Sequence, residues 1–324
     1  MRGTYLLLIL VVLLACNDQP DQVSILHQPP FNSLSDSIIQ QPQNAGLYYR
    51  RGVMLYQEGE KKLAEADIRK AWEIEPTEEY GLSLTTILRE KSADSAIVFL
   101  QKAIEKVPES IAFHIGLARG YQQKGRNEEA IAIVDKILEQ FPGQLDALTL
   151  KSEILGAENK TDESIIYLER AYSLVPSDFS LAYDLAYEYA MANNAKVVAH
   201  TDSLIKKRTP EIEKAYFTRG LYYANTGNAL LALKEYDASI KSNYNFADAW
   251  LEKGILLFNQ KRFEDAQLNF ERALKVAPAN AMFYYWLGKC QEARGYTPEA
   301  KLNYQKAYGL DKELTEAKQA AEKL

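Results

Sequence analysis

Apolar and small residues recur along the chain at helical spacing, in segments separated by short polar turns. The pattern is clearest in residues 247–280, where Trp250, Gly254 and Leu257 lie at intervals of four and three, and the same intervals recur after a polar turn. Because such intervals bring side chains onto one face of a helix, each segment has one apolar face. The pattern predicts two short amphipathic helices joined by a turn.

This helical pair repeats along the chain with a period close to 34 residues. One step, after Pro76, is 32 residues long, and Tyr244 stands where one proline is expected. The prolines that mark the period are Pro42, Pro76, Pro108, Pro142, Pro176, Pro210 and Pro278. Eight units begin near residues 45, 79, 111, 145, 179, 213, 247 and 281. A period of this length predicts stacked units, each of which contacts only its neighbours.

The unit over residues 247–280 resembles the tetratricopeptide repeat. It departs from that family's pattern with Lys253 and Leu257, where the family has Leu and Tyr. It keeps the pattern at Trp250, Gly254, Ala266, Phe270 and Pro278. The resemblance implies an all-α fold, a right-handed superhelical solenoid of about eight helix-turn-helix units over residues 44–314.

Small residues are expected where the two helices of a unit approach most closely. Gly254 on the first helix and Ala266 on the second leave room for the backbones to meet, so a larger residue at 254 would overpack the contact. Between the helices we expect residues that tolerate left-handed backbone. These are Gly59, Gly125, Asn159, Asn193, Gly227 and Gly295.

Both ends of the repeat array carry weaker helical patterns. Residues 16–43 contain several Gln-Pro pairs and predict an extended tether, within which Leu34 and Ile38 favour an N-terminal capping helix over 31–41. Residues 315–324 predict a C-terminal capping helix that covers the last unit.

The N-terminus is a basic start, Met1-Arg2, followed by an apolar run over residues 5–14. The run is too short for a membrane span, which needs about 20 residues, and is typical of a secretory signal peptide. Its end, Leu13-Leu14-Ala15-Cys16, resembles the lipobox of bacterial lipoproteins. The resemblance implies removal of residues 1–15 and acylation of Cys16 with chains such as palmitate, which would anchor the protein to a membrane. The alternative is a plain signal peptide with an incidental cysteine.

The residues after the cysteine bear on the membrane to which such a lipoprotein is sorted. Asn17-Asp18-Gln19 places its acidic residue one position late for an inner-membrane retention signal and too isolated for a surface-export signal. We therefore expect a lipid-anchored protein of the bacterial cell envelope, at the outer membrane.

Residues suited to catalysis are sparse. His27, His114 and His200 are the only histidines, and none has a cysteine or second histidine at metal-ligand spacing. Phosphate loops and nucleophile motifs are absent, and Cys290 is expected to pack as a small apolar residue. The net charge is −6 and basic clusters are short, which argues against nucleic acid as a partner. No enzyme activity, cofactor or metal is expected.

The concave face is therefore the expected functional surface. In proteins similar to this one, positions 2, 5, 9, 12 and 13 of each first helix line that face. The candidate partner-binding residues are Tyr49, Tyr183, Tyr187, Phe217, Leu221, Leu251, Ile255, Phe258, Tyr285 and Lys289. Chaperone-binding members of the family hold a carboxylate with Lys and Asn, where this chain has Tyr49 and Val53. An apolar groove favours a hydrophobic segment or an amphipathic helix, although these side chains could equally do no more than cover neighbouring repeats.

We accordingly expect a non-enzymatic, membrane-tethered scaffold or adaptor that binds another envelope protein. Two alternatives stay open: a lipoprotein that binds a glycan or small ligand, since aromatic faces also stack on sugars, and a pilotin-like assembly factor of a secretion or pilus system. The sequence specifies neither the partner nor the oligomeric state.

Overall fold

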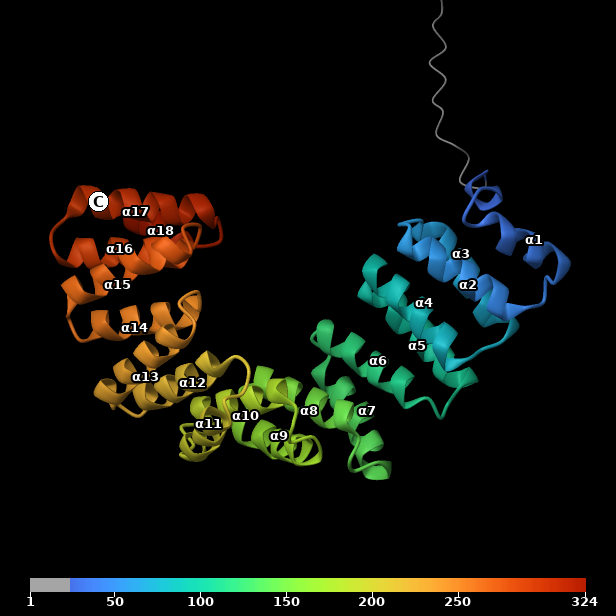
Figure 1. Ribbon diagram of the computed structural model, residues 1–324, viewed down its shortest axis with the longest axis horizontal. Helices are drawn as coiled ribbons and strands as arrows, with labels where there is room; N and C mark the ends of the chain where they lie inside the picture. The colour runs from blue at the N-terminus through green and yellow to red at the C-terminus, as the bar shows by residue number, and fades with distance from the viewer. Residues whose placement is uncertain (1–23) are drawn as a thin grey trace, which may run out of the picture. The chain divides into compact units, whose positions relative to one another are not determined.

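The computed structural model describes residues 24–324, and this part of the chain is helical throughout (Figure 1). It contains one short 3-10 helix, η1 (Ser24–His27), and eighteen α-helices, with no strand among the described residues. The predicted all-α fold class is confirmed. The predicted signal peptide and Cys16 lie outside the described residues.

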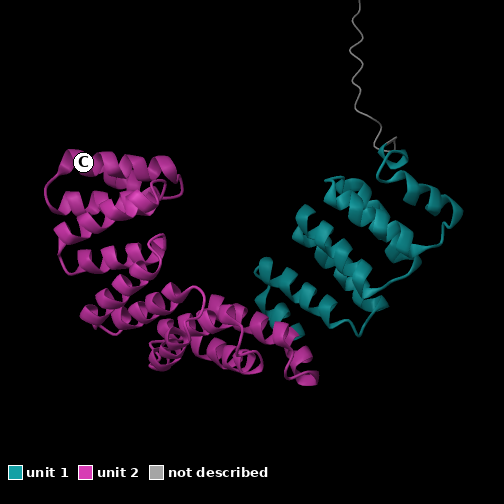
Figure 2. Cartoon of the chain, in the orientation of Figure 1, with its two compact units in different colours: residues 1–133 teal, residues 134–324 magenta. Residues whose placement is uncertain are grey.

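The chain divides into two compact units, residues 1–133 and 134–324 (Figure 2). The boundary falls inside α7 (Asn127–Gln140). Unit 1 contains α1 (Asn32–Gln40), α2 (Ala45–Gln57), α3 (Lys61–Ile74), α4 (Glu78–Lys91), α5 (Ala93–Lys106) and α6 (Ile111–Gln123).

Unit 2 continues the same alternation of helices and short turns. Its helices are α8 (Leu145–Ala157), α9 (Thr161–Leu174), α10 (Phe179–Met191), α11 (Lys196–Lys207), α12 (Ile212–Asn225), α13 (Ala229–Ser242), α14 (Ala247–Asn259), α15 (Phe263–Val276), α16 (Ala281–Ala293), α17 (Thr297–Leu310) and α18 (Thr315–Lys323). The first helix of each predicted repeat begins within one residue of the position expected from the sequence.

Packing follows the order of the chain within each unit. Helices pair as hairpins, α2 with α3 in unit 1 and α12 with α13 or α16 with α17 in unit 2, and each hairpin packs on the next, as α3 does on α4 and α15 on α16. Such nearest-neighbour packing is what a stack of repeats requires, because one hairpin alone cannot bury its apolar faces.

The turns inside the hairpins have the predicted backbone. All six predicted turn residues have positive φ, from 54° at Asn193 to 85° at Gly59. Lys261 takes the same conformation, with φ of 60°, between α14 and α15, where the sequence offers neither Gly nor Asn. Left-handed backbone at this position of a hairpin is therefore not restricted to Gly and Asn. A lysine also adopts it, at some conformational cost.

Gly254 lies close to the second helix of its hairpin, as predicted, but the residues nearest to it are Phe270 and Asn269 rather than Ala266. A Cβ built on Gly254 would lie 2.3 Å from Cζ of Phe270, whose side chain has no exposed surface. Gly220 and Gly288 stand in the same relation to Tyr236 and Tyr304. Each glycine makes room for an aromatic ring of the second helix, so the ring can fill the space between the helices.

The first hairpin is joined to α1 by a buried polar network. Arg51 on α2 donates from Nε and Nη2 to the two carboxylate oxygens of Asp67 on α3, at 2.6 and 2.8 Å, and from Nη1 to Oγ of Ser35 on α1, at 2.9 Å. Phe31, which precedes α1, and Leu34 on α1 are also buried. The short helix α1 thus covers the first hairpin with both apolar and hydrogen-bonded contacts.

At the other end, α18 packs against α17. Ala321 on α18 is buried with Ala300 and Tyr304 on α17, and Leu324 packs against the same cluster. The polar residues of α18 remain on its outer side, as a terminal helix of a stack requires.

Candidate partner-binding groove

The predicted partner-binding side chains of unit 2 lie on its first helices, α10, α12, α14 and α16, each of which contacts the next. Phe217, Leu251, Ile255 and Phe258 are partly buried against one apolar cluster that spans α12 to α16. We call the groove row the residues Tyr187, Phe217, Leu221, Leu251, Ile255, Phe258, Tyr285 and Lys289. All of them retain exposed surface, and Tyr187 is 45% exposed.

Tyr183, in contrast, offers no surface to a partner. Its side chain is 5% exposed, and its hydroxyl lies 2.8 Å from Oγ1 of Thr209 and donates to the carbonyl of Pro210 at 2.6 Å. Burial raises the pKa of Tyr183. The residue therefore ties α10 to the start of the next hairpin, and we leave it out of the proposed surface.

Tyr49 belongs to unit 1 and is treated separately. Its ring lies 4.6 Å from that of Tyr80, and its hydroxyl is 3.1 Å from Oγ of Ser83 on α4. It is only partly exposed. These contacts connect two neighbouring hairpins, so the larger exposed part of the candidate surface lies in unit 2.

An aromatic cluster surrounds Lys289 in the last repeat. The ammonium of Lys289 lies 4.3 Å from the ring centre of Trp286, and 5.4 and 5.5 Å from those of Phe258 and Tyr285. Such contacts hold a cation over ring faces. Trp286 also has a buried indole N–H without a hydrogen-bond partner in the described part of the chain. The sequence pattern missed Trp286 because it occupies position 6 of its helix, outside the expected groove positions.

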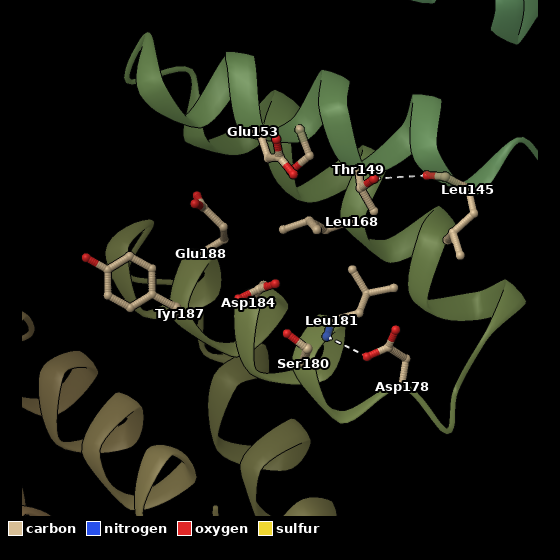
Figure 3. Close-up of a pocket in the computed structure, with 11 residues that line it drawn as sticks. Leu145, Thr149, Glu153, Leu168, Asp178, Ser180, Leu181, Asp184, Tyr187 and Glu188 are labelled. Atoms are coloured by element: carbon tan, nitrogen blue, oxygen red, sulfur yellow. Dashed lines mark hydrogen bonds between the residues drawn. The ribbon is translucent and has the colours of Figure 1, made fainter. Parts of the chain in front are cut away.

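A pocket of about 450 Å³ opens between α8 and α10, next to Tyr187 (Figure 3). Glu153 projects from α8 toward the pocket, and Asp184 and Glu188 project from α10. The other lining residues are Leu145, Thr149, Ser152, Leu168, Asp178, Ser180 and Leu181. Acidic groups thus dominate one end of a groove that the sequence predicted to be apolar and aromatic.

The carboxylates of this pocket do not all have the same role. Asp178 accepts a hydrogen bond from the backbone N–H of Leu181 at 3.1 Å and so caps the start of α10. Asp184 and Glu188 lie one helical turn apart on the pocket side of α10 and take no part in capping. Unlike Asp178, these two carboxylates do not cap α10.

The environment makes Asp184 and Glu188 harder to ionise. Burial, and then the charge of Glu153, raise the pKa of Asp184, which the charge of Lys214 opposes; burial, and then the charge of Asp184, raise the pKa of Glu188. An acid whose pKa is higher in the folded state favours folding while it is protonated. That contribution is lost as the pH rises from the ordinary carboxyl range through the raised values. At neutral pH both ionised groups therefore oppose folding.

The residues considered for chemistry have packing contacts. His114 and His200 each place a ring nitrogen 2.9 Å from a backbone carbonyl, and Cys290 is fully buried, which raises the pKa of its thiol to about 12. Over residues 24–324, no three side chains of the types that bind metals are grouped closely enough to hold an ion. No helix in that same range has both the length and the hydropathy to cross a membrane.

Comparison with known proteins identifies the repeat. Family models described as tetratricopeptide repeat match residues 45–78, 88–154, 145–178, 217–268 and 259–313. The chain belongs to the tetratricopeptide repeat family. The helical hairpins, the glycine contacts and the turns described above are thus those of tetratricopeptide repeats.

Curated relatives are distant and longer than this chain. The Hsp70-Hsp90 organizing protein of Triticum aestivum is 23% identical in an alignment of 242 residues that covers 63% of this chain and 42% of that protein. The human protein O-mannosyl-transferase TMTC1 is 22% identical over 71% of this chain but only 23% of its own length. The chain therefore spans less than half of the length of these relatives.

Solved structures share the fold. A tetratricopeptide repeat protein from Parabacteroides merdae has a TM-score of 0.54 at 14% identity, covering 86% of this chain and 98% of that one. PilW, a type IV pilus biogenesis factor, has a TM-score of 0.51 at 19% identity, covering 64% of this chain and 96% of its own. At these identities the likeness concerns the fold alone.

Proposed function

We propose that this protein is a non-enzymatic scaffold that binds a peptide or helix of a partner protein along the groove row of unit 2. The observation that carries the proposal is that partly exposed apolar and aromatic side chains recur on the consecutive first helices α10, α12, α14 and α16. An amphipathic helix places apolar residues at regular intervals along one face and can lay that face in such a groove. Aromatic side chains suit the centre of an interface because they bury large areas.

The relatives support a binding role. One of them is named an organizing protein for two other proteins, and PilW is named a biogenesis factor of a pilus. The match to the mannosyl-transferase covers only 23% of that protein, so it does not argue for enzymatic activity here. The partner we propose is another protein of the bacterial envelope. A more specific form of this proposal is that the partner is a component of a pilus or secretion apparatus.

Replacing Tyr187 and Leu221 together by alanine is expected to abolish partner recovery in a pull-down from the native cell. Both side chains retain exposed surface on the groove row, whereas Phe217 packs against Tyr236 and Phe246, so its truncation would also disturb the core. The measurement is the amount of crosslinked partner, identified by mass spectrometry, with helical content checked by circular dichroism.

The matched control for this pair is Ile166→Ala with Leu302→Ala. These side chains are 55% and 52% exposed and lie on the second helices α9 and α17 of their hairpins. The control should recover the partner at the wild-type level. Equal recovery with the groove variant would show that the groove row is not the binding surface.

We further propose that the protein is attached to the membrane through acylated Cys16. Acyl chains provide stable attachment when two or more are present. In the native cell we expect the chain in the membrane fraction, with mass spectrometry showing an N-terminal acylated Cys16, and a Cys16→Ser variant in the soluble fraction. An unmodified Cys16 in the mature protein would contradict the anchor and leave the groove proposal untouched.

A further inference from the structure

The pocket between α8 and α10 differs in charge from the rest of the groove row. From Phe217 to Phe258 the row is apolar, and at its far end Lys289 adds a positive charge. Around the pocket the charged lining residues are all acidic, Glu153, Asp178, Asp184 and Glu188. The groove thus has a negative end, an apolar centre and a positive end.

Two lysines near the pocket form their ion pairs elsewhere. Lys151 on α8 is engaged by an ion pair with Asp135 and lies 4.4 Å from the ring centre of Tyr167. Lys214 on α12 acts on Asp184 only at long range and forms its ion pair with Glu211, at 2.9 Å. Neither lysine forms an ion pair with Asp184 or Glu188.

We infer that this pocket receives a lysine or arginine side chain of the partner segment that lies along the groove row. The inference rests on the proposed function and adds the chemistry of one contact. The occupant is an amphipathic segment with a basic residue at the end that reaches α8 and α10.

The shape and the donors of the pocket suit a basic side chain. Asp184 and Glu188 offer carboxylate oxygens from neighbouring turns of one helix, an arrangement that can accept several N–H donors at once (Figure 3). The exposed ring of Tyr187 borders the same space and presents a face to a cation. The apolar side chains Leu168 and Leu181 can cover the methylene stem.

The energetics of the pocket point the same way. Burial raises the pKa of Asp184 and of Glu188, so the unliganded chain disfavours their ionised forms. A bound cation would favour the ionised forms and remove this penalty. Groups that oppose folding and face a pocket are candidates for a functional role.

The test is a selection of random peptides of about 16 residues, displayed on phage and captured by the purified full chain, a length that covers the groove-binding face of a helix. We expect the selected peptides to share a lysine or arginine at one end of an apolar pattern. Replacement of that basic residue by glutamine should weaken binding to the wild-type chain by about tenfold or more.

Three variants make this test specific. Against Asp184→Asn with Glu188→Gln, the same peptide replacement should change the affinity by less than about twofold, because the two charges act on the same side chain. Glu188→Gln alone should give an intermediate value. Asp162→Asn with Glu163→Gln removes two exposed charges at the start of α9, away from the pocket lining, and should retain the full tenfold effect.

The outcomes separate this inference from the proposed function. The inference alone would be overturned if the selected peptides bind through the groove row but lack a basic residue. It would also be overturned if replacing the basic residue by glutamine weakened binding to Asp184→Asn with Glu188→Gln as much as binding to wild type. Failure of the wild-type chain to select any peptide, or selection of peptides that bind Tyr187→Ala with Leu221→Ala as well as wild type, would overturn both.

Discussion

Replacing Arg51 by alanine is expected to destabilise the first hairpin by about 3–5 kcal/mol, the largest effect we expect for a single residue. The side chains of Arg51 and Asp67 are each only 10% exposed, and the guanidinium meets both carboxylate oxygens. Removal of the arginine leaves a buried carboxylate without its partner and also removes a hydrogen bond to Ser35. Hydrogen exchange of the α2 and α3 amides measures the loss, because it reports the free energy of local opening.

A double replacement shows whether Arg51→Ala destabilises the hairpin because Asp67 loses its charge partner or because the packing of the arginine side chain is lost. Arg51→Met with Asp67→Leu fills the site with apolar groups of similar size and is expected to recover most of the stability. Protection in α16 and α17 should be unchanged in both variants, because repeats contact only their neighbours. Wild-type exchange rates in α2 and α3 of the Arg51→Ala protein would show that the pair contributes no net stability.

The Arg51 network shows what a repeat pattern can and cannot predict. Arg51 and Asp67 occupy the same positions in their hairpin as Arg219 and Glu235 do in theirs, where the arginine donates to the carboxylate at 2.6 Å. The period of 34 residues, applied to charged as well as apolar residues, would have indicated both pairs. A search for apolar faces alone ignores them, because it treats every charge as solvated.

The fold was predictable because its signals are local and repeated. Glycine at the helix contact and glycine or asparagine at the turn each answer a steric requirement that recurs in most of the hairpins, so several weak signals reinforce one another. Lys261 marks the limit of that argument, since its left-handed backbone is imposed by the hairpin rather than by the residue type.

The groove was predictable only in part, since repeat positions give the direction of a side chain but not its partners. Tyr183 occupies a groove position, yet Thr209 and Pro210 take its hydroxyl into the interior. Asp184 and Glu188 occupy positions outside the expected set and line the pocket nonetheless. Whether such a side chain faces a pocket or the interior depends on its burial and on hydrogen bonds to residues distant in the sequence. Both depend on the neighbouring hairpin against which it packs.

Gly254→Leu is expected to destabilise the repeats around α14 and α15 by about 1–3 kcal/mol or more. Even a Cβ at this position would meet Cζ of Phe270 at 2.3 Å and Nδ2 of Asn269 at 2.8 Å. Phe270 has no exposed surface and packs near Phe283 and Trp286, so it has no space into which to move. A lower thermal midpoint and faster exchange in α14 to α16 are the measurements.

Gly309→Ala is the matched control for the contact at Gly254. Gly309 also lies in a helix, α17, but a Cβ there meets no atom within 4 Å. Because alanine reduces the conformational entropy of the unfolded chain, this variant should be as stable as wild type or more stable by up to about 1 kcal/mol. If the control and Gly254→Leu melted at the same temperature, close approach of the two helices would not be what selects glycine at 254. The ring of Phe270 would then have to be accommodated by a shift of the two helices of the hairpin relative to each other.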